Sequence, residues 1–121
     1  MIVFIFLEIT ILGMALVPDP FLQLMTQRLR ALSHPARLSI VRVVVQGPAE
    51  GIPAGEIQTR LGIPGSTLSH HLSDLTDAGL LTATRERTTI RYAARFDNLK
   101  VLTDYLWKDC CGGGDRNPCC P

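Results

Sequence analysis

Two helical segments joined by a glycine-containing turn constrain the fold more than any other feature of this chain. The first covers residues 54–62 and ends at Gly62. The second opens at Pro64 and Ser66, ends at Gly79, and has three apolar residues at helical spacing: Leu68, Leu72 and Leu75. Two short helices joined by a tight turn form a helix-turn-helix unit.

A charged hairpin is expected directly after the second of these helices. Residues 80–95 are rich in β-branched side chains and alternate around the charged run Arg85, Glu86 and Arg87. A hairpin in this position makes the unit a winged helix-turn-helix. The predicted fold class is therefore mainly α, with a small β-hairpin wing.

Three further helices surround this unit. Residues 20–32 have the wide apolar face of an amphipathic helix. Ser33, followed closely by a proline, predicts the start of a core helix that ends at Gly47. Residues 48–53 are expected to form a loop, and Asp97 is expected to cap the last helix.

Composition limits the class of protein without naming a partner. The chain has 121 residues, of which 46% are hydrophobic and 19% charged, so it is expected to form one globular domain. Large multidomain enzymes, repeat arrays and low-complexity chains are excluded. The formal net charge of +1 neither requires nor excludes a polyanionic partner.

The first residues differ in character from the rest. Residues 1–18 are apolar except for Glu8 and Thr10, are short for a membrane span, and have neither a basic start nor a small-residue cleavage site. We expect translation to start at Met14; an additional helix packed on a dimer and a membrane anchor are the alternatives. The expected organisation is an apolar segment over 1–19, a winged-helix domain over 20–109, and a tail over 110–121.

The cysteines are all confined to the tail. They lie within the last twelve residues: Cys110, Cys111, Cys119 and Cys120. A disulfide framework distributes its cysteines through a fold, so this clustering indicates a local thiol site instead. Metal or metalloid ligation and a redox switch are the chemistries that such a site offers.

Three stretches of the chain resemble the ArsR/SmtB family of winged-helix metal-sensing repressors. They are ALSHPARLSIVRVVV, LGIPGSTLSHHLSDLTDAGLL and TRERTTIRY, and the most specific part runs from Ser66 to Leu81. The resemblance covers about residues 20–108. It implies a cytoplasmic repressor with no enzymatic activity and no membrane association. It also implies a homodimer formed through the first and last helices, with recognition helices in successive major grooves of double-stranded operator DNA.

The resemblance also indicates which residues face DNA. On the recognition helix they are Ser66, Thr67, Ser69 and His70. Short hydroxyl side chains reach phosphates or base edges without blocking close approach, although Ser66 could instead cap the helix. Arg85 and Arg87 are expected to reach the minor groove or phosphates, with a solvated turn as the alternative.

The histidines are not expected to bind metal. His71 lies nearer the core edge than His70, so packing is expected for it. The adjacent pair points to different faces of the helix. No carboxylate or cysteine spacing supports a site that also includes His34.

The family's usual sensor sites have no counterpart here. Residues 52–57, where arsenical repressors carry a Cys-x-Cys run, contain no cysteine, and the last helix contains no histidine. The tail resembles a minority arrangement in which an adjacent cysteine pair and a third cysteine bind trivalent arsenic. Cys110 and Cys111 are then ligands, with Cys119 or Cys120 as the third. Arsenite is the expected inducer, antimonite should bind likewise, methylarsenite could use two thiolates, and no cofactor is required.

Other uses of the thiols remain open at this point. Four thiolates could bind zinc or cadmium, although zinc sites usually space their ligands as Cys-x-x-Cys. The two cysteine pairs could also form a redox switch. A catalytic dithiol of an arsenic-handling enzyme is disfavoured, because no cofactor motif, activating base or CxxC accompanies the cysteines.

Overall fold

A computed structural model describes residues 19–108, and its helices and strands follow the expected order. The helices are α2 (Pro20–Leu32), α3 (Pro35–Val45), α4 (Ala54–Leu61), α5 (Gly65–Asp77) and α6 (Phe96–Trp107). The strands are β1 (Ile52–Pro53), β2 (Leu81–Glu86) and β3 (Thr89–Ala94). The expected segment over 1–19, apart from its last residue, and the expected tail over 110–121 lie outside the described residues.

Helix α2 covers the predicted range and begins at an acidic cap. The Asp19 carboxylate accepts a hydrogen bond of 2.6 Å from the Leu22 backbone N–H, which satisfies a free donor of the first turn. The buried side chains of α2 are Met25, Arg28 and Ala31. This helix therefore presents a cation, as well as apolar groups, to the interior.

The cap of α3 is His34 rather than Ser33, so that prediction is wrong. Pro35 disfavours helical backbone in the residue before it, and His34 is accordingly extended, with φ −111° and ψ 129°. Its Nδ1 accepts from the Ala36 N–H at 3.1 Å. Ser33 instead closes α2, since its hydroxyl donates to the Arg30 carbonyl at 2.7 Å.

Helices α4 and α5 form the predicted helix-turn-helix unit. Gly62 ends α4 in the left-handed conformation, with φ +65°, which glycine adopts without steric cost. The three leucines of α5 are buried, as their spacing predicted: Leu68, Leu72 and Leu75. They pack in one core with residues that include Ile40, Val44 and Ile57.

The wing has a third strand, which was not expected from the sequence. Residues 48–53 are not entirely a loop, because Ile52 pairs with Tyr92 and Pro53 with Arg91, which gives an antiparallel sheet in the order β1-β3-β2. Gly51 has φ +97°, and a Cβ there would lie 2.8 Å from the Tyr92 carbonyl oxygen. Glycine therefore permits the close approach that brings Ile52 onto β3.

The last helix begins without the expected cap. Arg95, directly after β3, is the N-cap residue of α6, and its side chain forms no capping hydrogen bond. Asp97 lies in the first turn, where its carboxylate accepts a hydrogen bond from Arg95 Nη2 at 3.4 Å. Its negative charge there interacts favourably with the positive end of the helix dipole. The prediction of an Asp97 cap is wrong by position, because the chain enters the helix directly from the strand.

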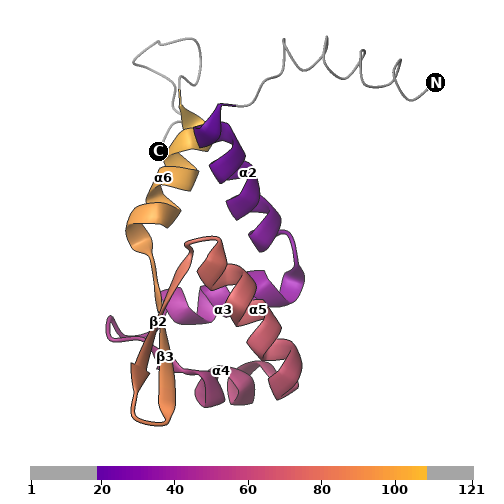
Figure 1. The fold of residues 1–121 in the computed structure, drawn as a ribbon, viewed down its shortest axis with the longest axis vertical. Helices are drawn as coiled ribbons and strands as arrows, with labels where there is room; N and C mark the ends of the chain where they lie inside the picture. The colour runs from indigo at the N-terminus through magenta and orange to yellow at the C-terminus, as the bar shows by residue number, and fades with distance from the viewer. Residues whose placement is uncertain (1–18, 109–121) are drawn as a thin grey trace, which may run out of the picture.

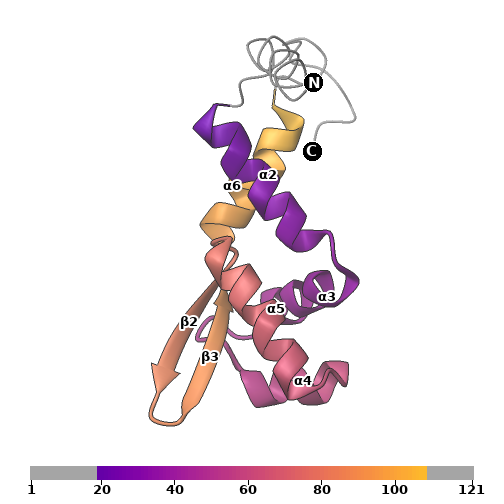
Figure 2. The same cartoon turned by 45° about the vertical axis from the view of Figure 1, so that its right-hand side comes forward.

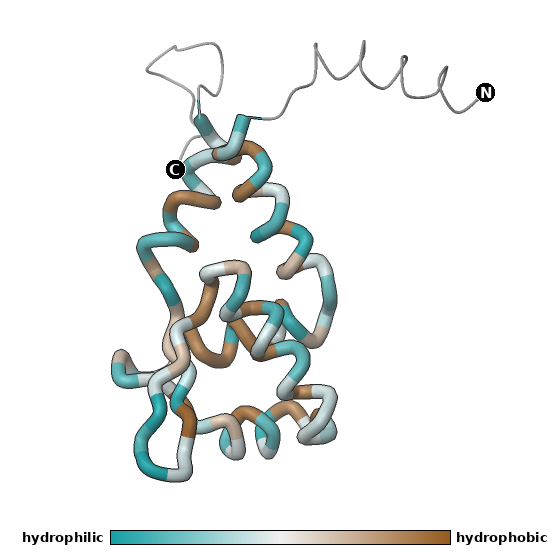
Figure 3. The backbone as a smooth tube through the Cα atoms, in the orientation of Figure 1, coloured by the Kyte–Doolittle hydropathy of each residue, from teal (hydrophilic) through white to brown (hydrophobic). Residues whose placement is uncertain are grey.

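The elements separate into two ends of an elongated molecule. Helix α2 begins and α6 ends at one extremity, whereas the wing and the helix-turn-helix unit lie toward the other (Figures 1 and 2). Apolar residues occur along α3 and α5 as well as along α2 and α6 (Figure 3). The predicted winged helix-turn-helix fold is confirmed. Among the helices of residues 19–108, none is long and apolar enough to cross a membrane.

Candidate nucleic-acid interface

The outer face of α5 is polar and exposed. The four side chains predicted to face DNA are all exposed there: Ser66, Thr67, Ser69 and His70. The Ser69 hydroxyl donates to the Gly65 carbonyl at 3.0 Å, which leaves its oxygen lone pairs available as acceptors. The first turn of α5 has no acidic residue, so the positive end of its dipole faces outward without a local negative charge.

Ser66 does not cap α5. The N-cap residue is Pro64, which has no side-chain hydrogen bond, and Ser66 is the second residue inside the helix. The interpretation of Ser66 as a cap is therefore wrong. Its hydroxyl lies on the exposed first turn, a position from which helices contact phosphates.

The wing tip carries two arginines outside the ion pairs of residues 19–108. Arg85 and Arg87 are exposed, and neither takes part in any of those pairs. Arg87 has φ +55° in the turn between the strands. Arg91 is different, because its Nε lies 3.1 Å from the Glu86 carboxylate. The sheet thus leaves Arg85 and Arg87 available for a negatively charged partner.

The wing tip and the beginning of α5 lie toward the same end of the molecule, away from the extremity where α2 and α6 meet (Figures 1 and 2). The four polar residues share one helix, whereas Arg85 and Arg87 belong to a separate element. The predicted residues thus form two exposed groups. A partner long enough to span both could contact them together.

His71 is buried on the opposite side of α5 from the polar face. It is 9% exposed, and its ring centroid lies 4.7 Å from that of His34. Burial lowers the pKa of His71, and His34 and Arg37 lower it further. Its Nδ1 has no hydrogen-bond partner among the described residues. The prediction that His71 packs in the interior is confirmed.

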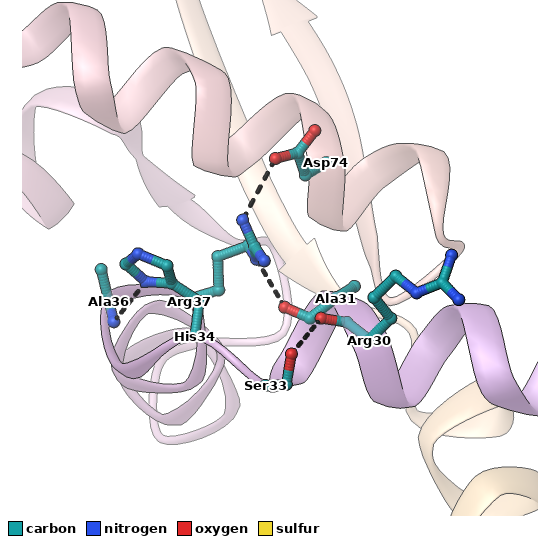
Figure 4. Close-up of polar contacts among 7 residues, drawn as sticks. All are labelled: Arg30, Ala31, Ser33, His34, Ala36, Arg37 and Asp74. Carbon is teal, nitrogen blue, oxygen red and sulfur yellow. Dashed lines mark hydrogen bonds and ion pairs between the residues drawn. The ribbon is translucent and has the colours of Figure 1, made fainter.

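Arg37 of α3 connects its own helix to α2 and α5 (Figure 4). Its Nε donates to the Ala31 carbonyl of α2 at 2.6 Å, and its Nη1 lies 3.2 Å from the Asp74 carboxylate of α5. The Arg37 side chain is 18% exposed, against 57% for Asp74. This arginine therefore fixes the end of α2 and the start of α3 against the recognition helix.

The described residues hold no metal site. No group of three His, Cys, Asp or Glu side chains within residues 19–108 is arranged to bind a metal ion. The predicted ligands Cys110, Cys111, Cys119 and Cys120 lie outside this range, so their ligation remains a prediction.

Helices α2 and α6 present apolar side chains to solvent. Phe21 and Tyr105 pack edge to face with ring centroids 5.3 Å apart. Beside them is a groove of about 320 Å³, lined also by Val101, Asp104 and Lys108. The exposed apolar residues of the two helices are Phe21, Leu22, Leu24, Leu29, Phe96, Val101, Leu106 and Trp107. A monomer rarely exposes so many large apolar groups on adjoining helices, so this surface is suited to a protein partner.

Two polar residues that bind backbone carbonyls at the end of α5 were not expected from the sequence. Arg28 of α2 donates to the Ala78 carbonyl at 3.3 Å, and Asn98 of α6 donates to the Gly79 carbonyl at 2.8 Å. The burial of Arg28 could have been predicted, because it lies at helical spacing between Met25 and Ala31 on the buried face of α2. For Asn98 the sequence offered none.

Known regulators share this chain's sequence pattern. A family model described as a helix-turn-helix domain matches residues 32–83. The HTH-type transcriptional regulator YgaV of Escherichia coli is 36% identical over 74 residues, which are 61% of this chain and 73% of that protein. The biofilm growth-associated repressor of Agrobacterium fabrum is 34% identical over 83 residues, 69% of this chain and 68% of that protein.

Solved structures share the fold. An ArsR-like transcriptional regulator from Rhodococcus sp. matches with a TM-score of 0.64 at 25% identity, over 73% of this chain and 80% of that one. A homodimeric winged helix-turn-helix DNA-binding domain from Mycobacterium bovis, described as a possible ArsR-family regulator, matches with a TM-score of 0.59 at 24% identity. That match covers 80% of this chain and 90% of the other.

Proposed function

Because this chain belongs to the ArsR family of winged-helix transcriptional regulators, we propose that it is a dimeric repressor released from its operator by trivalent arsenic. The relatives are transcriptional regulators rather than enzymes. The proposal has three parts, which concern the DNA, the dimer and the inducer.

The exposed polar face of α5 is the observation that carries the DNA-binding part. Its hydroxyl and imidazole groups, on Ser66, Thr67, Ser69 and His70, are exposed on a helix whose first turn has no acidic residue. Such a helix enters a major groove without electrostatic repulsion from the phosphates. Arg85 and Arg87 of the wing add sequence-independent attraction to the backbone or the minor groove.

The apolar surface of α2 and α6 supports a homodimer. Trp107 is 52% exposed and Leu106 is 58% exposed, and both are costly to leave in water. A second copy that used the same surface would cover these groups with a two-fold interface. The homodimeric state of the Mycobacterium bovis neighbour is consistent with this arrangement.

The cysteine cluster supports the inducer. Cys110 and Cys111 follow the end of α6 at Trp107 after only two intervening residues. Trivalent arsenic is soft and takes three thiolates, so an adjacent pair and either Cys119 or Cys120 match its needs. Ligation there would constrain the end of α6, which meets Phe21 of α2 and borders the proposed dimer surface. The resulting shift between protomers would change the separation of the two α5 helices and weaken operator binding.

A duplex selected by the purified chain from a random-sequence pool provides the test. Operator affinity is measured by fluorescence anisotropy with and without arsenite, antimonite, methylarsenite, zinc, cadmium or a thiol oxidant. We expect arsenite to lower the affinity roughly 5- to 150-fold, the usual range of allosteric coupling, and Cys110→Ser to abolish the response without changing affinity in its absence.

Each contrary result identifies the part of the proposal that fails. Release by zinc or cadmium alone would make this a divalent-metal sensor, and release by the oxidant alone a redox sensor. If no duplex is enriched over the starting pool, the DNA-binding part is wrong.

A further inference from the structure

The turn that ends the recognition helix is held by both terminal helices. Three successive carbonyls, of Ala78, Gly79 and Leu80, accept hydrogen bonds from outside the turn. The donors are Arg28 Nε at 3.3 Å, Asn98 Nδ2 at 2.8 Å and the Arg95 N–H at 2.9 Å. Arg28 belongs to α2, Asn98 to the first half of α6, and Arg95 is the N-cap of α6. We call Ala78–Leu80 the α5 junction.

The backbone of α5 is already closed without these donors. The Gly79 N–H donates to the Thr76 carbonyl and the Leu80 N–H donates to the Leu75 carbonyl, both at 3.0 Å, the pattern of a Schellman cap. Gly79 adopts φ +76°, as that cap requires. Because the cap uses the junction's N–H groups, its carbonyls remain free to accept from α2 and α6. The carbonyls at the end of α5 thus accept hydrogen bonds from donors on α2 and α6.

Burying the Arg28 guanidinium in this position costs free energy. It is 7% exposed, and none of the ion pairs within residues 19–108 includes it. Burying a guanidinium without a carboxylate is unfavourable unless its charge meets well-placed acceptors. The end of α5 supplies one such acceptor, the Ala78 carbonyl, at the negative end of the helix dipole. An apolar residue of similar length would fill the same space without this cost, so the hydrogen bond is what distinguishes arginine here.

The two side chains converge on one residue. A Cβ added to Gly79 would lie 3.2 Å from Asn98 Nδ2 and 3.5 Å from Arg28 Nη2. The junction therefore lies where a donor from α2 and a donor from α6 approach each other, and in Figure 1 it is drawn between the lower halves of those helices. At their far ends the same helices meet through Phe21 and Tyr105. A change in the angle between α2 and α6 would accordingly displace the two donors relative to each other at Gly79.

We infer that Arg28 and Asn98 are positioning residues that couple the α2 and α6 pair to the orientation of the recognition helix. They do not touch DNA in this arrangement. They determine how α5 is presented to it, and they transmit a rearrangement of the terminal helices to α5. The inference rests on the proposed DNA binding through α5, but it does not depend on which inducer the protein senses.

Two variants and two matched controls test the inference. Arg28→Met keeps the length of the side chain without its donors, and Asn98→Ala removes the other donor. Arg30→Met removes the same charge from an exposed position of α2. Thr103→Ala removes a hydroxyl of α6 that bonds only to carbonyls of its own helix. The pool-selected duplex and an unrelated duplex of equal length are titrated with each protein, at a temperature where circular dichroism shows it folded.

We expect each junction variant to bind the selected duplex about 2- to 30-fold more weakly than its control, the range found for residues that carry coupling between sites. Affinity for the unrelated duplex should match that of the control, because phosphate attraction does not require a fixed orientation of α5. Arg28→Lys, which retains a cationic donor, should recover part of the loss. If Arg28→Met does not fold, Asn98→Ala at its half-buried site supplies the same comparison.

Hydrogen exchange gives a readout that a purely structural role would not move. A saturating amount of the selected duplex should slow amide exchange in α5 and, through the junction, in α6. In the junction variants protection of α5 should remain, whereas protection of α6 should be lost. Retained protection of α6, or losses of affinity equal for both duplexes, would overturn the inference. If the unaltered chain binds no selected duplex, it is the proposed function that has failed.

Discussion

Arg37 offers the sharpest test of how α2, α3 and α5 are held together. Its two contacts differ in solvent exposure. The hydrogen bond to the Ala31 carbonyl is partly buried, whereas the Asp74 side chain is 57% exposed. A hydrogen bond that involves a charged group contributes about 1.5–3 kcal/mol. An exposed ion pair contributes only about 0–1 kcal/mol, because solvent screens it.

These contributions predict an unequal pair of variants. Arg37→Met should lower the free energy of unfolding by about 2–3 kcal/mol, and Asp74→Asn by less than about 1 kcal/mol. For a domain of this size the first change corresponds to a drop in melting temperature of roughly 10 °C or more. Most of the loss should come from the bond that fixes the end of α2, because Met can still fill the apolar space.

Urea denaturation followed by circular dichroism measures both changes. Protomer concentration must be held constant, because the proposed dimerisation would contribute to apparent stability. The double variant should cost little more than Arg37→Met alone, since the ion pair is already lost. Equal losses in the two single variants would refute the reasoning, because the ion pair and not the Ala31 carbonyl would then be the principal contact.

Three other measurements test the interface and its surroundings. Changing Ser69 and His70 together to Ala should weaken binding of the selected duplex while the melting temperature stays unchanged, because both are exposed; normal affinity would remove them from the interface. Arg87→Ala should weaken binding to all sequences and flatten the salt dependence by about one unit of slope, and an unchanged slope would mean that Arg87 makes no phosphate contact. Because burial lowers the pKa of His71, the folded chain disfavours its proton, and stability should fall as pH drops below 6.5. His71→Gln should reduce this slope in urea titrations, and an identical slope would assign it to other groups.

The elements with a strong local period were predictable from the sequence. Helix α5 was recognised because its three leucines repeat at helical spacing and Gly79 provides a left-handed end. The hairpin was recognised because its alternation continues on both sides of a charged turn. In each case the local conformational preference of the residues agrees with their burial in the fold, so the sequence pattern is enough to predict the element.

Elements defined by a distant partner were not predictable. Strand β1 is two residues long and exists because Ile52 reaches the edge of β3, about forty positions away in the chain. No alternation develops over two residues. The prediction of the α3 cap failed for a different reason. Pro35 holds the residue before it in an extended conformation, and the ring nitrogen of that residue, His34, accepts the capping hydrogen bond that a serine usually accepts.

For the candidate site, the sequence indicated the groups that face outward but not those that hold them. Exposure of Ser69 or His70 follows from the leucine period alone. The contacts of Arg28 and Asn98 end on backbone carbonyls, which every residue possesses, so no side chain at the receiving position marks the bond. Only the tertiary fold determines which carbonyl each side chain meets.

Because the junction joins donor side chains to backbone carbonyls, the proposed sensor and the proposed DNA-binding face can change in sequence independently of each other. The end of α6, which the cysteines follow in the sequence, and the beginning of α5 lie toward opposite ends of the molecule (Figure 1). The α5 junction is formed by donor side chains on α2 and α6 and by backbone acceptors at the end of α5. A substitution on the outer face of α5 alters which bases are contacted and leaves the junction acceptors in place. A substitution among the cysteines alters what is sensed and leaves the junction donors in place. Coupling is then altered chiefly by Arg28, Asn98 or the left-handed Gly79. Variants at these three positions should weaken binding of the selected duplex and change its response to the inducer, while inducer binding persists.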